Sequence, residues 1–135
     1  MAVRYLIDTD ICIYLRQKQP PAAWARFERI EPGEGAISVI TYGELAYGAY
    51  KSSDPKKRLA WLERLTGLLP VLPLPDRTGD AYGRIRSYLE AAGEVVGAHD
   101  LWIAAHALAS GLVLVTNNER EYRRVKDLKI ENWTK

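Results

Sequence analysis

The sequence predicts an α/β fold with a small, mainly parallel β-sheet that carries helices on both faces. Short apolar runs, typical of strands, alternate along the chain with longer amphipathic stretches. This alternation indicates βαβ units, whose strands run parallel and are buried on both sides. A length of 135 residues with 47% hydrophobic residues suits one domain over residues 1–135 with a sizeable core.

Five short runs are expected to form the strands, because they are rich in β-branched residues or leucine. In chain order they are Val3–Ile7, Ala36–Ile40, Val71–Leu74, Leu112–Val115 and the shorter Lys129–Glu131.

Seven stretches between these runs are expected to be helical. Pro21 suits the first turn of a helix, and Gly93 and Gly111 follow stretches that they would terminate. The predicted helices are Asp10–Arg16, Pro21–Ile30, Thr41–Lys51, Pro55–Leu69, Arg77–Ala92, Leu101–Ser110 and Glu119–Val125.

The composition argues against a disulfide framework and against a membrane protein. The single cysteine, Cys12, lies in an apolar stretch, which is typical of a buried thiol in a reducing compartment. No segment reaches the roughly 20 apolar residues that span a bilayer, and no secretory leader is recognisable. We therefore expect a cytoplasmic protein.

The net charge of +2 provides no strong overall field that would attract nucleic acid. Two local clusters are basic, "KSSDPKKR" and "EREYRRVKDLK". Each taken alone is typical of a solvated helix surface.

Polar side chains follow three of the predicted strands. In a parallel sheet, ligands bind beyond the carboxyl ends of the strands, so these positions are candidates for chemistry. The residues are Asp8 and Asp10 after the first strand, Ser38, Thr41 and Glu44 at and after the second, and Thr116, Asn117 and Asn118 after the fourth. Asp100 opens a later helix and can join them.

Several carboxylates in one place repel each other and raise their own pKa values. A divalent cation relieves this repulsion, and ligands that are all oxygen favour Mg²⁺ or Mn²⁺ over zinc. The chain has no Cys/His pattern with zinc spacing. Such a cation can activate water and neutralise charge on a phosphodiester, which is nuclease chemistry.

Most of these acids also have a structural interpretation. Asp10 is placed to cap the helix that follows it, and Thr41 with Glu44 forms a T-x-x-E capping box. Asp100 suits an N-cap or the first turn of a helix. Asp8 ends a buried strand where no cap requires it, so function is the better explanation.

The histidines and aromatic residues favour structural roles. His106 lies on an apolar helix and is expected to pack, and His99 is expected to be exposed. The four tryptophans are too scattered for a base-stacking platform. Tyr47 and Tyr50 share a helical face, which suits packing or contact with a partner.

Four segments together resemble the VapC toxins, which are PIN-domain ribonucleases. They are "YLIDTDICIYL", "ISVITYGELAYGA", "VGAHDLWIAAHALASGLVLVTNNEREYRRV" and "LKIENW", in the family's order and spacing. The resemblance implies a PIN-like domain and a Mg²⁺-dependent endoribonuclease, with Mn²⁺ as a substitute. It further implies the toxin of a type II toxin–antitoxin pair, a homodimer neutralised by a VapB-type antitoxin. The implied substrate is RNA, with tRNA expected and the anticodon loop of initiator tRNA as one example.

The resemblance also assigns roles to individual residues. Asp8, Glu44 and Asp100 match the family's metal-binding acids, and the Thr116 hydroxyl matches the group that supports the first of them. The fourth acidic position lies in "TNNEREY", among Asn118, Glu119 and Glu121. Glu121 matches the glutamate of the family's "REF" ending and is the expected fourth catalytic acid. Asn118 and Asp10 are expected to support the metal-binding acids.

Cations near the predicted site are candidates for gripping the RNA backbone: Arg16, Lys18, Arg120 and Arg123. Two alternatives remain open at this point. A PIN module could bind RNA or a partner without cutting. "LIDTDIC" is also similar to the D-x-D motif of haloacid-dehalogenase-like phosphatases, in which the first aspartate is a nucleophile.

Overall fold

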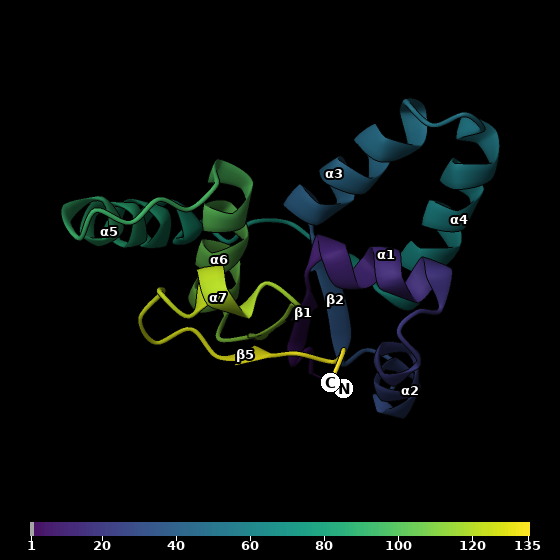
Figure 1. Cartoon of the computed structure of the whole chain (residues 1–135), viewed down its shortest axis with the longest axis horizontal. Coiled ribbons are helices and arrows are strands. Elements are labelled where there is room, and N and C mark those ends of the chain that lie inside the picture. The colour runs from purple at the N-terminus through teal and green to yellow at the C-terminus, as the bar shows by residue number, and fades with distance from the viewer. Residues whose placement is uncertain (1) are drawn as a thin grey trace.

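The computed structural model describes residues 2–135 and contains a five-stranded sheet with the order β3-β2-β1-β4-β5 (Figure 1). Every pair of neighbouring strands is parallel, as the sequence predicts. The strands are β1 (Tyr5–Ile7), β2 (Gly35–Ser38), β3 (Val71–Leu72), β4 (Val113–Val115) and β5 (Ile130–Glu131).

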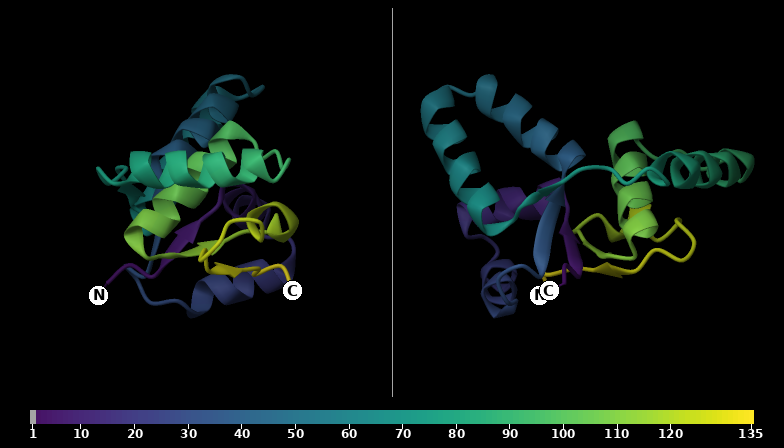
Figure 2. Two further views of the ribbon diagram at one scale, coloured as in Figure 1. Left: turned by 90° about the vertical axis from the view of Figure 1, so that its left-hand side faces the viewer. Right: turned by 180° about the vertical axis from the view of Figure 1, so that it is seen from behind.

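Seven helices join these strands. They are α1 (Thr9–Gln17), α2 (Pro21–Arg29), α3 (Val39–Tyr50), α4 (Pro55–Leu68), α5 (Thr78–Ala91), α6 (Ala98–Ser110) and α7 (Glu119–Tyr122). Helices α3 and α4 project together on one side of the sheet, and α5 and α6 lie on the other (Figures 1 and 2).

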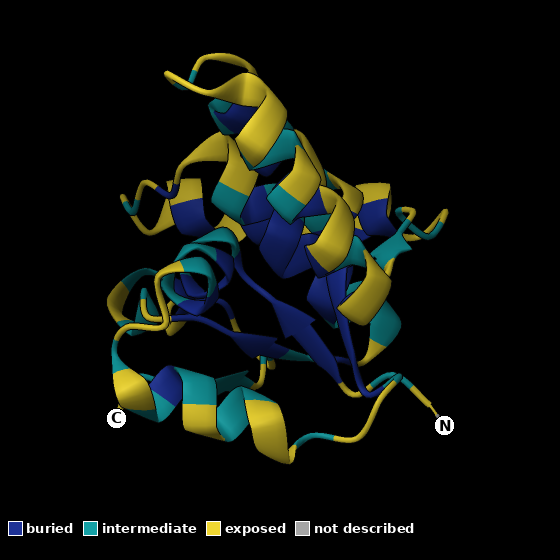
Figure 3. Cartoon of the chain, turned by 90° about the vertical axis from the view of Figure 1, so that its right-hand side faces the viewer, coloured by how far each residue is buried: buried dark blue, intermediate teal, exposed yellow. Residues whose placement is uncertain are grey.

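Alternate residues of each central strand enter different cores, as the two-residue period of a strand requires. Leu6 and Leu114 pack into a cluster with α5 and α6, whereas Ile7 and Val115 pack into a cluster with α1 and α4. Figure 3 shows the central strands as the most deeply buried layer, with exposed residues on the outer faces of the helices and in the loops. The sheet is therefore covered on both faces.

The element boundaries differ from the prediction where capping residues decide them. The second strand ends at Ser38 rather than Ile40, because the Ser38 hydroxyl accepts a hydrogen bond from the Ile40 amide (3.1 Å) and begins α3. Helix α6 begins at Ala98 rather than Leu101, and α7 ends at Tyr122 rather than Val125. Most of the remaining boundaries agree within about two residues, which is the usual uncertainty at helix ends.

Two structural interpretations are confirmed. Cys12 is fully buried, and burial, followed by the charges of Asp8 and Asp10, raises its pKa well above the ordinary range. His106 is also fully buried and its Nδ1 lies 2.8 Å from the Ser38 hydroxyl, while burial lowers its pKa. None of the helices in residues 2–135 combines the length and apolar character that crossing a membrane needs.

Candidate metal-dependent active site

The adjacent ends of β1 and β4 bring Asp8 next to Thr116. The two strands pair in register from Tyr5 to Ile7, and the Asp8 amide donates to the Val115 carbonyl (2.8 Å). The Thr116 hydroxyl then donates to Asp8 Oδ2 (2.8 Å), and the Thr9 amide donates to Asp8 Oδ1 (2.8 Å). Both carboxylate oxygens are therefore fixed by neighbours from different strand ends.

Asp8 is an acid held in the interior of the protein. Burial, followed by the nearby charge of Asp10, raises its pKa from 3.8 to about 7, and Asp100 adds to the increase. The hydrogen bonds from Thr116 and Thr9 oppose this effect only in part. Asp8 is also the N-cap of α1, a structural role that the sequence analysis missed.

Asp10 does not cap α1, contrary to the prediction, but lies in its first turn. Its Oδ1 accepts from the Ile11 amide (2.7 Å), and its Oδ2 accepts from the Asn117 amide (3.0 Å). Burial raises its pKa. Asp10 therefore ties the start of α1 to the loop after β4, beside Asp8.

Asp100 and Glu121 approach the same place from α6 and α7. Asp100 lies in the first turn of α6, as predicted, with Gly97 at the cap position. Burial, followed by a hydrogen bond with Glu121 and its charge, raises the pKa of Asp100 to about 6. Glu121 retains its charge, because hydrogen bonds from Asp100, the Gly97 amide and Asn118 outweigh burial and lower its pKa.

Glu44 reaches the edge of this cluster from α3. Its Oε1 accepts a hydrogen bond from the Thr9 hydroxyl (2.8 Å), and its Oε2 lies 3.4 Å from His99 Nδ1. The predicted capping box of Thr41 and Glu44 is wrong, because Ser38 is the N-cap of α3 and Thr41 lies inside the helix. Glu44 also raises the pKa of Asp100, so the two side chains are electrostatic neighbours.

Glu119 points away from the cluster. It forms an ion pair with Lys135 (2.8 Å) and accepts a hydrogen bond from the Asn132 side chain (2.8 Å). These two partners lower its pKa to about 2. The sequence left both glutamates as candidates for the fourth acid. The fold places Glu121 beside Asp100, whereas Glu119 binds residues of the C-terminal tail.

The residues fit a hard divalent cation in their chemistry. Asp8 and Asp100, with Glu44 and Glu121 close by, offer only oxygen donors, and burial, followed by the charges of neighbouring acids, raises the pKa of both aspartates. Within residues 2–135, no three His, Cys, Asp or Glu side chains are arranged closely enough to enclose one ion. Mg²⁺ does not require such a cage, since it commonly binds through one or two carboxylates together with waters and substrate phosphates.

Comparison with known proteins assigns the family. The family model described as "PIN domain" matches residues 5–128. The chain belongs to the PIN-domain family.

Relatives within this family are VapC proteins. The chain is 38% identical over 131 residues to "Ribonuclease VapC2" of Haemophilus influenzae, covering 97% of this chain and 98% of the relative. It is 38% identical over 132 residues to "tRNA(fMet)-specific endonuclease VapC" of Shigella flexneri, covering 98% and 99%. These matches place the chain in the VapC ribonuclease group and confirm the resemblance.

Solved structures agree in fold. The VapBC-1 structure from nontypeable Haemophilus influenzae matches with a TM-score of 0.91 and 36% identity, covering 100% of both chains. The DNA-bound VapBC structure from Salmonella typhimurium matches with a TM-score of 0.91 and 38% identity, covering 97% and 98%. The PIN fold expected from the sequence is therefore confirmed.

The four candidate RNA-binding cations of this PIN domain lie on α1 and on and after α7. Arg16 lies over the Trp61 ring (5.2 Å to the centroid) and Lys18 over the Trp24 ring (4.9 Å), at the far end of α1 from Asp8. Arg123 forms an ion pair with Glu119 (3.1 Å), and Arg120 is exposed on α7.

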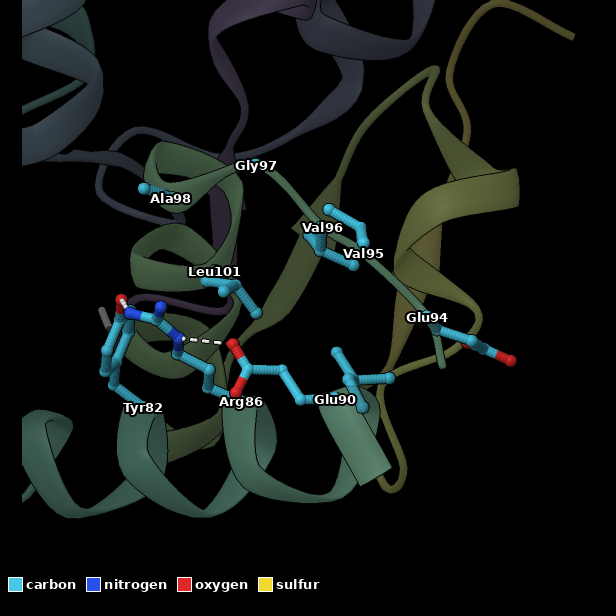
Figure 4. Close-up of a pocket in the computed structure, with 10 residues that line it drawn as sticks. Tyr82, Arg86, Glu90, Glu94, Val95, Val96, Gly97, Ala98 and Leu101 are labelled. Atoms are coloured by element: carbon cyan, nitrogen blue, oxygen red, sulfur yellow. Dashed lines mark hydrogen bonds and ion pairs between the residues drawn. The ribbon is translucent and has the colours of Figure 1, made fainter. Parts of the chain in front are cut away.

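Two hollows flank the acids. A groove of about 720 Å³ runs from Glu44 and His99 along α3 past Tyr47 to Lys51. A cavity of about 340 Å³ lies between α5, α6 and the loop before α6 (Figure 4). Arg86 in that cavity is bound to Glu90 (2.9 Å) and to the Tyr82 hydroxyl (3.0 Å). Glu44 lines the groove, whereas none of the four candidate acids lines the cavity, so the groove is the better entrance to the acids.

The sequence analysis missed three contributors to the site. Thr9 separates the two aspartates of "DTD" and donates to Glu44, and His99 is exposed as predicted but also contacts Glu44. Tyr122 is fully buried close to Asp100. Of these three residues, only Thr9 could have been recognised from the sequence, because it directly follows Asp8 and its hydroxyl therefore lies at the same strand end.

The raised pKa of Asp8 predicts that replacing it stabilises the metal-free protein. The folded-state pKa of about 7 exceeds the unfolded value of 3.8, so the folded state binds the extra proton and stability decreases as pH rises from about 4 to 8. Asp8→Asn removes this cost, and we expect it to raise the free energy of unfolding by about 1–3 kcal/mol at pH 8. The asparagine side chain has a single oxygen and cannot accept the hydrogen bonds of both Thr9 and Thr116. The gain in stability therefore stays below the free energy that corresponds to the full pKa shift of Asp8.

Urea unfolding in EDTA at pH 8 and pH 4 measures this effect. The gain should shrink to a small fraction near pH 4, where Asp8 is protonated in the folded state and partly protonated in the unfolded state. An equal effect of Asp8→Asn at both pH values would contradict the buried, charged state of Asp8.

Proposed function

We propose that this chain is a VapC-type toxin, a divalent-metal-dependent endoribonuclease, and that Asp8, Asp100, Glu44 and Glu121 are its catalytic acids. The observation that carries the proposal is the convergence of Asp8 and Asp100 at the carboxyl edge of the sheet, where Asp8 is buried, Asp100 is half-buried, and the charge of Asp100 contributes to the raised pKa of Asp8. Such repulsion is costly unless a cation and a phosphate occupy the site.

In the mechanism, Asp8 and Asp100 would hold Mg²⁺, or Mn²⁺ as a substitute, and Glu44 is the third candidate ligand. The cation supplies Lewis-acid activation of a water and neutralises charge on the scissile phosphate. Thr116 holds Asp8 through its hydroxyl, and Asn118 holds Glu121 through its side-chain amide. Glu121 accepts a hydrogen bond from Asp100 and thereby ties α7 to the first turn of α6.

The partners follow from the relatives. One relative is named for tRNA(fMet), and the solved structures are VapBC complexes. We accordingly propose tRNA as the substrate, a VapB-type antitoxin as the inhibitor and a homodimer as the assembly, which would place the protein in the cytoplasm. Tyr47 and Tyr50 on α3 are 65% and 69% exposed, which favours contact with a partner over packing within the chain.

The two alternatives can now be separated. The PIN-domain match and the fold argue against the phosphatase. In a phosphatase, Asp8 would have to attack as an exposed nucleophile. Here Asp8 is only 5% exposed, and both of its carboxylate oxygens accept hydrogen bonds. The non-catalytic binding module retains the same fold, and it differs from the proposal only in activity.

Asp100→Asn tests the catalytic role. The amide can still donate to Glu121, so the fold should be preserved, but a ligand charge is lost. We expect cleavage of tRNA in Mg²⁺ to fall by at least about 100-fold, the size that loss of a metal-orienting or charge-stabilising group commonly produces. Asp80→Asn is the matched control, since Asp80 is an exposed acid on α5 that pairs only with Arg84.

Gel analysis of labelled tRNA fragments, with and without EDTA, gives the measurement. Full activity in Asp100→Asn would refute the mechanism. Wild-type protein that binds tRNA without cutting it in Mg²⁺ or Mn²⁺ would instead establish the binding module.

Glu121 and Glu119 offer an internal comparison for the fourth acid. Glu121→Gln removes the charge that pairs with Asp100, whereas Glu119→Gln removes a charge that binds Lys135 and Asn132. We expect Glu121→Gln to reduce kcat by about tenfold or more, the range seen when a residue supporting a metal ligand is lost. Glu119→Gln should retain most activity.

Initial rates of tRNA cleavage and melting temperatures for both variants measure the difference. A reversed order, with Glu119→Gln inactive at an unchanged melting temperature, would move the fourth acid to Glu119.

A further inference from the structure

The segment "LKIENW" brings a half-buried asparagine, Asn132, to the carboxyl edge of the sheet. β5 pairs with β4 up to this edge, where the Thr116 amide donates to the Glu131 carbonyl (2.9 Å). On the other side of Asn132, Trp133 is 2% exposed and packs edge-on against Tyr5, with 5.5 Å between the ring centroids. Asn132 is therefore held between a strand end and a buried anchor, beside the loop that follows β4.

Asn132 uses both hydrogens of its side-chain amide on that loop. Its Nδ2 donates to Asn117 Oδ1 (3.0 Å) and to Glu119 Oε2 (2.8 Å). Its Oδ1 accepts from the Thr134 amide (2.9 Å), which fixes the orientation of the Asn132 side chain. The Thr134 hydroxyl lies 3.1 Å from Asn117 Oδ1 as well. The segment after β5 thus holds Asn117, an exposed residue, by its side chain.

Asn117 connects this segment to the start of α1. Its backbone amide donates to Asp10 Oδ2 (3.0 Å), and its side-chain Nδ2 donates to the Tyr14 hydroxyl (3.2 Å). Asp10 is two residues from Asp8, in the first turn of the same helix. Asn117 is therefore bonded on one side to the segment after β5 and on the other side to the helix that Asp8 caps.

The residues on either side of Asn117 determine how Asp8 is held. The Asn118 amide donates to the Thr116 hydroxyl (2.9 Å), so the hydroxyl proton is free to point to Asp8 Oδ2 (2.8 Å). The backbone of Asn117 links the two partners of this relay. A rotation of the chain at Asn117 would displace the Asn118 amide from Thr116 and, with it, the hydrogen bond that orients Asp8.

We propose that Asn132 is a positioning residue, which holds the loop after β4 through Asn117 so that Thr116 orients Asp8 for a divalent cation. The proposal rests on the metal-dependent function proposed above. Asn132 touches none of the four candidate acids in this arrangement and acts only through the loop. Replacing residues that orient a metal ligand commonly weakens metal affinity by tenfold or more.

Asn132→Asp tests the role with almost no change in shape. The new carboxylate oxygen would face two acceptors, Asn117 Oδ1 and Glu119 Oε2, so both contacts of the amide become repulsive. The added negative charge by itself would favour a nearby cation, and a loss of affinity therefore reports on geometry. Lys135→Gln is the matched control, because it breaks the ion pair between the same segment and Glu119 (2.8 Å) but leaves the contacts of Asn117 intact.

Isothermal titration calorimetry of the full chain with Mn²⁺ alone, without RNA, gives the dissociation constant. We expect Asn132→Asp to bind Mn²⁺ about tenfold more weakly and Lys135→Gln to bind as the wild type does. Asn132→Ala is the second variant. It deletes the same two contacts without adding charge, so we expect a loss in the same direction.

Hydrogen exchange of single amides, followed by NMR in EDTA, tests the loop without metal. The Asn117 amide should exchange about fivefold faster in Asn132→Ala than in the wild type, the size that loss of one hydrogen bond produces. The Leu114 amide, which donates to the Lys129 carbonyl within the sheet (2.9 Å), should be unaffected. Equal protection of Asn117 in both proteins would overturn the proposal.

Kinetics separate positioning from a purely structural role. At subsaturating Mn²⁺, kcat for tRNA cleavage by Asn132→Ala should fall by about tenfold with KM for tRNA unchanged, and saturating Mn²⁺ should restore kcat. A structural role alone would lower the melting temperature and loosen Asn117 without changing Mn²⁺ affinity, and that result would contradict the proposal.

The outcomes also distinguish this proposal from the proposed function. If the wild type binds Mn²⁺ and cleaves tRNA while both Asn132 variants do so equally well, Asn132 has no positioning role and the function stands. If the wild type binds no Mn²⁺ and does not cleave, the metal site fails and the role of Asn132 fails with it.

Discussion

Asp8 is a carboxylic acid that the fold withdraws from water, and the rest of the site is arranged around that constraint. It directly follows a strand whose three residues are all buried, and it is 5% exposed itself. Burial raises its pKa to about 7, even though a hydroxyl and a backbone amide donate to its two oxygens. A charge in this position is tolerated only when opposite charge compensates it.

The parallel sheet explains why further acids come to the same place. β1 lies at the centre of the sheet between β2 and β4, so the elements that follow these three strands share one edge. The chain after β1 carries Asp8, the helix after β2 carries Glu44, and the loop and helix after β4 carry Thr116 and Glu121. Helices α5 and α6 pack on the same face of the sheet, against residues of β1 and β4. The first turn of α6 carries Asp100. The acids are distant in sequence and become neighbours only through this topology.

Much of this arrangement could be predicted from the sequence, because strand-like runs and the polar residues behind them are local patterns. Asp8, Glu44 and Asp100 were recognised in this way, and the VapC-like segments gave the fold. Capping was predicted less well. Asp10 and the Thr41–Glu44 box fit the local rules, but Asp8 and Ser38 hold the caps, since a strand end and a helix start coincide at each of them.

Contacts between distant elements were beyond the reach of sequence patterns. The choice between Glu119 and Glu121 depends on Lys135 and Asn132, which return from the C-terminus to engage Glu119. The contact of Asn132 with Asn117 likewise depends on how the segment after β5 packs beside the loop after β4. Spacing alone carries no information on either contact, because each is determined by tertiary packing.

The central claim is that Asp8 and Asp100 hold one hard cation, and anomalous diffraction from crystals soaked in Mn²⁺ tests it most directly. The account predicts an anomalous peak ligated by carboxylate oxygens of both residues, at about 2.0–2.2 Å for an ion of this class. A structure with no peak at these two residues at millimolar Mn²⁺, or with a peak held only by acids elsewhere on the surface, would contradict it.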